Sequence, residues 1–143
     1  MPQGLIQPNN SILYAGNPKY MEYEVKTATS CYPGRLVITD TNEYSVKVAT
    51  DGAVTVLGVL DVEPNELRET IYGAGDQARV ITGDCIVLLK AASGATIAVG
   101  TRVEAAADGM VEELADEDAE IGYSLQAATP GAGGEWILVK LTI

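Results

Sequence analysis

The side chains that most often carry out catalysis are sparse in this chain. Histidine is absent from all 143 residues, which removes the commonest general base and the commonest metal ligand. No Gly-x-Ser-x-Gly nucleophile motif occurs. The stretch GAGD at 73–76 lacks the lysine and hydroxyl residue that end a phosphate-binding loop. We therefore predict that the protein is not an enzyme and that it binds no cofactor.

The two cysteines, Cys31 and Cys85, lie far apart and match no Cys-x-x-Cys pattern. Each falls in or beside a predicted strand, where a free cysteine packs as a small hydrophobic residue. We favour two buried free thiols. A disulfide between them and chemical reactivity are the alternatives.

The densest charged segment is acidic and spans residues 112–120. Its acidic members are Glu112, Glu113, Asp116, Glu117, Asp118 and Glu120. Ca²⁺ prefers such oxygen ligands, but the spacing differs from that of an EF-hand loop. We favour a solvated loop between strands and predict no metal site, with Ca²⁺ binding as the alternative.

Composition limits the choice of partners. The chain is 47% hydrophobic and carries a net charge of −11, which is typical of one soluble folded domain or two small lobes sharing a core. Nine basic residues scattered among twenty acidic ones argue against nucleic acid and against an anionic membrane surface. No secretory signal and no long apolar span are present, so we expect synthesis in the cytoplasm of the producing cell.

The elements that must position these residues are predicted to be strands, separated by turns every eight to twelve residues or so. The predicted strands cover residues 21–27, 36–38, 43–50, 53–62, 77–82, 85–91, 102–104, 110–111, 120–128 and 135–143. A turn at Gly83-Asp84 separates two of them. One short helix is expected over residues 64–72, with Pro64 in its first turn. The pattern predicts an all-β sandwich or small barrel.

Residues 1–20 differ in composition from the β-domain predicted at 21–143. Three prolines in this segment disfavour a helix and break any long strand. Between them lie the apolar residues Leu5, Ile6, Ile12, Leu13 and Tyr14. We predict an extended arm that orders against a partner through these side chains, with a disordered terminus as the alternative. Trp136, in the last strand, is predicted to anchor the core or to lie at a subunit interface.

Two segments, 30–62 and 96–126, repeat the same order of features. Each has a glycine before a strand, an Asp-Gly turn, and a second glycine that would relieve crowding where strands meet. The matched residues are Gly34 with Gly100, Asp51-Gly52 with Asp108-Gly109, and Gly58 with Gly122. We predict that the two segments are duplicated units.

The second half also resembles the small capsid decoration, or cement, proteins of tailed bacteriophages. The family's strand starts, turn and closing strand are matched by Gly100 and Val103, Gly109 with Val111, Ile121-Gly122, and Val139 with Leu141. The stretch GAGDQARVITGDCIVLL at 73–89 is similar to the family's middle hairpin. The resemblance extends over residues 21–143, and the arm departs from the compact family pattern.

The resemblance implies a virion structural protein that decorates the outer surface of the capsid and stabilises the expanded shell. It implies the major capsid protein as partner, self-association as a homotrimer, and a place on the capsid exterior after synthesis in the host cytoplasm. The absence of catalytic motifs and the acidic charge agree with this function. The alternatives are a tail or head-fibre base component and a small β-barrel ligand-binding module.

Overall fold

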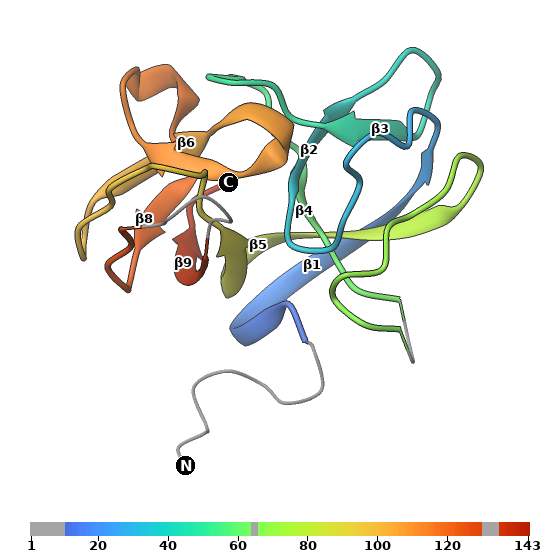
Figure 1. Cartoon of the computed structure of the whole chain (residues 1–143). Helices are drawn as coiled ribbons and strands as arrows, with labels where there is room; N and C mark the ends of the chain where they lie inside the picture. The colour runs from blue at the N-terminus through green and yellow to red at the C-terminus, as the bar shows by residue number, and fades with distance from the viewer. Residues whose placement is uncertain (1–10, 64–65, 130–134) are drawn as a thin grey trace.

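The computed structural model of the chain describes residues 11–63, 66–129 and 135–143 (Figure 1). The strands of these residues are β1 (Leu13–Val25), β2 (Leu36–Thr39), β3 (Ser45–Val48), β4 (Gly58–Leu60), β5 (Gln77–Lys90), β6 (Arg102–Ala105), β7 (Val111–Glu113), β8 (Gly122–Ser124) and β9 (Trp136–Leu141). Two short 3₁₀ segments, η1 (Ala107–Gly109) and η2 (Glu117–Ala119), flank β7. The prediction of an all-β fold is confirmed. None of the helical segments in these ranges is long and apolar enough to cross a membrane.

The nine strands form one sheet in the order β1-β3-β2-β4-β5-β9-β8-β6-β7. Because β1 also pairs with β5, the first five strands of this order close into a ring. The other end of the strand order also turns back toward β5, because Val111 of β7 forms a parallel bridge with Ala91, just beyond β5. The sheet is therefore two small barrel-like units that share the long strand β5.

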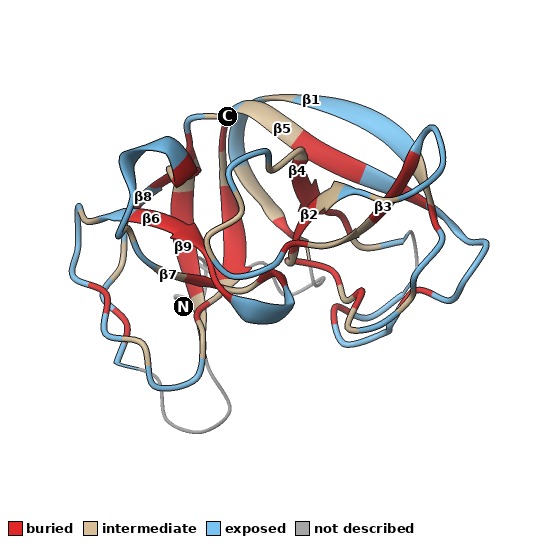
Figure 2. Ribbon diagram, turned by 90° about the horizontal axis from the view of Figure 1, so that it is seen from above, coloured by how far each residue is buried: buried red, intermediate tan, exposed pale blue. Residues whose placement is uncertain are grey.

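The core follows from the alternation of side chains along the strands. Val37, Leu60 and Val80 point into the first ring, where they pack with Val25, Cys31 and Val46. Their chain neighbours Leu36, Val59 and Ile81 face the other way, into a larger cluster shared with β9 and the second unit. Figure 2 shows the buried residues in red along β5 and β9. Burying each of these side chains contributes about 2 kcal/mol, and this cluster couples the two units.

The two units also share one pattern of backbone hydrogen bonds. β2 pairs antiparallel with β3 and β4, and β6 pairs antiparallel with β7 and β8. In the first unit, the N–H to C=O bonds run from Gly34 to Leu60 (2.8 Å), Leu57 to Val37 (2.9 Å), Leu60 to Arg35 (2.9 Å) and Asp61 to Arg79 (2.8 Å). In the second unit, the matching bonds run, in the same order, from Gly100 to Ser124 (2.8 Å), Ile121 to Val103 (3.0 Å), Ser124 to Thr101 (2.9 Å) and Leu125 to Leu138 (2.8 Å). Each residue of the first set has one counterpart in the second.

The second glycine of each unit lies where a side chain would collide with the neighbouring strand. A Cβ on Gly58 would stand 2.4 Å from the carbonyl oxygen of Ile81 in β5, and one on Gly122 would stand 2.2 Å from that of Lys140 in β9. Ile81 and Lys140 are themselves equivalent in the two networks. The matching glycines thus meet the same steric demand, as expected from the sequence.

The two Asp-Gly turns are not equivalent, and their predicted correspondence is wrong. Asp108-Gly109 links β6 to β7, whereas Asp51-Gly52 follows β3. In the first unit the loop that corresponds to Asp108-Gly109 is residues 40–44. The duplication of segments 30–62 and 96–126 stays a prediction, and its support is the glycines and the hydrogen bonds.

The predicted turn at Gly83-Asp84 is also wrong, because β5 runs unbroken through it. Gly83 has φ +94° within the strand and lies opposite Pro18 of β1. Across the same pair of strands, a Cβ on Gly16 would stand 2.7 Å from the Asp84 carbonyl oxygen. These glycines therefore permit a close approach of two long strands.

The predicted short helix does not form in the described part of its range. Residues 66–72 contain isolated turns, including a bond from the Thr70 N–H to the Leu67 carbonyl (2.9 Å). Tyr72 is held instead by tertiary contacts, because its N–H donates to Cys31 O (2.9 Å) and its hydroxyl donates to Asp61 O. A helix this short has little stability of its own against such bonds. Pro64 and residue 65 lie outside the described residues.

Part of the segment predicted as an N-terminal arm belongs to the sheet. Residues 13–20 form the first half of β1 and pair with β5 of their own chain, from Leu13 opposite Val87 to Tyr20 opposite Ile81. Pro18 is tolerated because β1 is bordered by β3 only at Glu24 and Val25, and proline is acceptable at a sheet edge. Residues 1–10 lie outside the described part of the chain.

Candidate partner-binding cleft and carboxylate cluster

A cleft of about 360 Å³ opens beside Trp136, at the start of β9. It is formed where the loop before β2, the loop after β4, the end of β5 and the start of β9 meet. Its lining residues are Tyr32, Pro33, Arg35, Arg68, Glu69, Lys90 and Trp136. Of the residues predicted to bind a partner, Trp136 is the one in this lining.

The Trp136 ring lies against the backbone of Gly34. A Cβ on Gly34 would stand 2.3 Å from Cζ3 of the ring and 3.4 Å from Cδ1 of Ile12. Gly34 thus brings together Ile12 and Trp136, two of the predicted partner-binding residues. Trp136 is half-buried and packs against the main core cluster, so one part of the ring anchors the core while another forms a wall of the cleft.

Cationic groups lie over the aromatic rings of the cleft. Arg68 Cζ is 5.0 Å from the centre of the Trp136 ring and Lys90 Nζ is 5.1 Å from it. Arg35 Cζ lies 5.1 Å from the Tyr32 ring, and its Nη1 donates to Asp108 O (2.9 Å). Burial lowers the pKa of both arginines, yet arginine stays charged at neutral pH. The cleft is therefore a cationic and aromatic site on an acidic protein.

The other predicted partner-binding residues are placed differently. Ile12 is fully buried in the core of its own chain, so its side chain is not free to contact a partner. Leu13 is half-buried and packs against the same core, and Tyr14 is half-buried beside it in β1. Leu5 and Ile6 lie outside the described residues.

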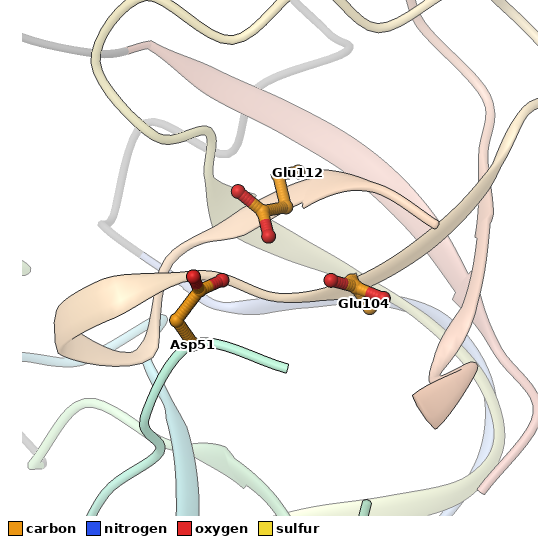
Figure 3. A group of neighbouring side chains, drawn as sticks. All are labelled: Asp51, Glu104 and Glu112. Atoms are coloured by element: carbon orange, nitrogen blue, oxygen red, sulfur yellow. The ribbon is translucent and has the colours of Figure 1, made fainter. Parts of the chain in front are cut away.

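Three carboxylates gather where the two units meet. Asp51 follows β3, Glu104 lies in β6 and Glu112 lies in β7, and oxygen atoms of all three lie within 4.8 Å of one another (Figure 3). Glu112 belongs to the acidic segment predicted at 112–120, but its partners come from elsewhere. Glu104 lies directly opposite Glu112 in the β6–β7 hairpin. Counting back across the Asp108-Gly109 turn could have identified that pair from sequence, but nothing local indicates Asp51.

The cluster is set up to retain a proton. Glu104 is buried, and its Oε1 accepts the N–H groups of Ala115 (3.0 Å) and Asp116 (3.3 Å). Burial, then hydrogen bonding with Asp51 and Glu104, raises the pKa of Glu112 to about 8. Glu112 is therefore protonated at neutral pH, which relieves the repulsion between like charges. The same three carboxylates are the group among the described residues that could hold a divalent cation.

Both cysteines are buried free thiols, as predicted. Cys31 packs inside the first ring and donates to Thr27 O at 3.3 Å, and Cys85 lies in β5. Burial raises the pKa of both thiols. Neither is the activated thiolate that cysteine chemistry requires.

Solved structures of phage proteins share this fold. A chain of the capsid of Myoviridae phage XM1 superposes with a TM-score of 0.64 and 17% sequence identity, over 98% of this chain and 92% of that one. The head fiber gp8.5 N base of bacteriophage phi29 superposes with a TM-score of 0.60 and 15% identity, over 88% of this chain and 95% of that one. No protein-family model and no curated protein sequence matches the chain.

Proposed function

We propose that this protein is a virion structural protein that decorates the outer surface of a phage capsid and stabilises the expanded shell. The observation that carries the proposal is the shared fold over 98% of this chain and 92% of a chain of the XM1 phage capsid. At 17% identity, what the two chains share is the β architecture and not a set of side chains. Decoration of a capsid requires a folded surface that binds the shell and no particular set of catalytic side chains.

The chemistry of the surface supports a binding role without enzymatic activity. The protein is acidic, with a net charge of −11 and no histidine, and both thiols are buried. The proposed partner is the major capsid protein. We further propose that the chain self-associates as a homotrimer. It would be synthesised in the host cytoplasm and would bind on the capsid exterior. The surface proposed for contact with these partners, the shell and further copies of the chain, is the side of the molecule with Trp136, Leu13 and Tyr14, extended by residues 1–10 with Leu5 and Ile6.

A head-fibre base is the second candidate function. It is favoured by the match to the phi29 head fiber base, of which 95% is covered. A base component connects a fibre to the shell, so both functions require binding to the capsid. They differ in how many copies each particle carries.

Quantitative mass spectrometry of purified virus particles separates the two functions. A decoration protein is expected at near-equimolar abundance with the major shell protein. A handful of copies per particle would instead support the fibre base, and absence from the particle would overturn both.

The contact surface is tested by binding to expanded shells. The structure restricts the useful truncation to residues 1–10, because Ile12 is part of the core and residues 13–20 belong to β1. The truncated protein should keep its melting temperature and bind expanded shells more weakly than the full chain. Equal binding by the two proteins would remove these residues from the contact surface.

A further inference from the structure

We propose that the cationic cleft beside Trp136 binds the acidic loop 113–118 of a second copy of this chain. The proposal deepens the self-association in the proposed function by naming the two surfaces that meet. Its test requires no capsid shells, so its failure and a failure of shell binding are separate results.

The cleft concentrates positive charge on a molecule that is negative overall. Arg35, Arg68 and Lys90 supply three of the nine basic residues of the chain, and Glu69 is the single acidic residue in the lining. The net charge of the whole chain is −11. A ligand drawn to this cleft by charge is therefore anionic.

The cationic groups are held in place before any partner arrives. Arg68 is only 7% exposed and lies over the Trp136 ring. Arg35 is fixed by its bond to the Asp108 carbonyl and by the Tyr32 ring. A guanidinium group carries five N–H donors in a planar fork that matches a carboxylate. Because the side chains are already ordered, little conformational entropy is lost when a carboxylate binds.

The same chain carries a matching anionic segment. Glu113, Ala115 and the run Asp116–Asp118 are exposed, and η2 makes the run a compact turn in which the Asp118 N–H donates to Asp116 Oδ1 (3.1 Å). None of the ion pairs between described residues involves this run. The ion pair next to it in sequence joins Arg102 to Glu120 (3.2 Å). Three consecutive acidic side chains thus project from one turn.

The cleft and the loop belong to different regions of the molecule. The cleft is built by the loops before β2 and after β4 and by the ends of β5 and β9, whereas the acidic loop follows β7. A contact between cleft and loop joins two different patches, so it is head-to-tail, and repetition of such a contact closes a ring when the rotation allows. Exposed charges dominate the contact, so salt should weaken it.

Reversing the charge of each surface tests the proposal. The loop variant is Glu117→Lys/Asp118→Lys, and the cleft variant is Arg35→Glu/Lys90→Glu. Each should raise the dissociation constant for self-association by about tenfold or more in sedimentation equilibrium at low salt. The chain with all four changes should recover most of that loss, because the charges of cleft and loop are then exchanged.

A control matched to the loop variant makes the same change of net charge elsewhere in the chain. Glu22 and Glu43 are exposed, and neither lines the cleft nor belongs to the acidic loop, so Glu22→Lys/Glu43→Lys should self-associate like the unaltered chain or more strongly. The loop variant changes exposed side chains only, so it keeps the test valid if the cleft variant fails to fold. A monomeric unaltered chain at all concentrations, or a loop variant that associates like the control, would overturn the proposal. Loss of shell binding in the cleft variant, with self-association unchanged, would show that the cleft binds the shell and would also overturn it.

Discussion

The two units of this protein share an arrangement of backbone strands and differ in the side chains that those strands carry. Equivalent glycines, strand pairings and hydrogen bonds recur in both. Yet the first unit is closed by β1, a strand of 13 residues, whereas the second is closed by a single bridge between Val111 and Ala91. Steric demands at the strand crossings are the same in both units, and the surfaces are free to differ.

The difference is sharpest at one equivalent cross-strand pair. The first unit places Ile38 opposite Lys47, and the second places Glu104 opposite Glu112. Two facing carboxylates destabilise a hairpin if both are charged. The second unit tolerates the pair because Glu112, whose pKa is raised to about 8, retains a proton. A shared backbone thus carries an Ile–Lys pair in one unit and a titrating cluster in the other.

The largest effect should come from filling the space at the second glycines. Gly58→Ala and Gly122→Ala each place a methyl group against a backbone carbonyl, and each should lower the free energy of unfolding by roughly 3 kcal/mol. If the units are equivalent, the two losses should agree closely in chemical denaturation. Gly94→Ala is the control, because a Cβ there has open space at φ +81°, and it should cost about 1 kcal/mol. Losses no greater than the control's would contradict this steric role.

The first glycines should distinguish the two units. Gly34 and Gly100 have nearly the same φ, +80° and +83°, and equivalent hydrogen bonds. However, a Cβ on Gly34 meets the Trp136 ring at 2.3 Å, and one on Gly100 meets nothing within 4 Å. Gly34→Ala should therefore cost about 2 kcal/mol and Gly100→Ala about 1 kcal/mol.

Tryptophan fluorescence identifies the cause of that difference. Trp136 is the only tryptophan of the chain, so a displaced ring should change the emission of Gly34→Ala and leave that of Gly100→Ala unchanged. Equal losses of stability with equal spectra would mean that the ring is not held by Gly34.

These contrasts show how much of the fold was available from the sequence. Alternation of apolar and polar residues predicts most strands, because a half-buried strand exposes every second side chain. The second glycines were found from their spacing in the sequence. Their steric role follows from two neighbouring backbones that leave no room for a Cβ atom. The Asp-Gly turns were mismatched because a turn dipeptide gives the place of a turn in the chain but not the strands that it connects.

Tertiary contacts decided what local sequence could not. Gly83-Asp84 has the composition of a turn, but β5 pairs with Gly16 to Pro18 of β1 at this point and continues through it without a break. The predicted helix was replaced by bonds from Tyr72 to Cys31 and Asp61. In the cleft, Arg35, Arg68 and Lys90 are spread over more than fifty residues of sequence, so no local pattern indicates that they meet around Trp136.

The titrating pair of the second unit gives a test with the smallest expected effect and a defined sign. The pKa of Glu112 is about 8 in the folded protein against an ordinary value of 4.5, so the folded state binds more protons between these pH values. Stability from this group is complete below pH 4.5 and is lost as pH rises toward 8. Glu112→Gln keeps a hydrogen-bond donor and cannot ionise, so it should be more stable than the unaltered chain at pH 9. The full difference in pKa corresponds to about 5 kcal/mol. Because Glu112 is only partly buried and solvent screens the repulsion, the expected gain in stability is ~1 kcal/mol.

The measurement is urea denaturation of Glu112→Gln and the unaltered chain from pH 5 to pH 9. The two stabilities should be close at pH 5 and separate as pH rises, because only the unaltered chain must ionise Glu112 beside Asp51 and Glu104. Glu113→Gln, one position along β7 and exposed, is the control and should follow the unaltered chain. Parallel curves for Glu112→Gln and the unaltered chain would mean that Glu112 is charged at neutral pH. The facing carboxylates would then destabilise the second unit throughout this pH range, and the contrast with the Ile38–Lys47 pair would appear as a constant loss of stability instead of a titration.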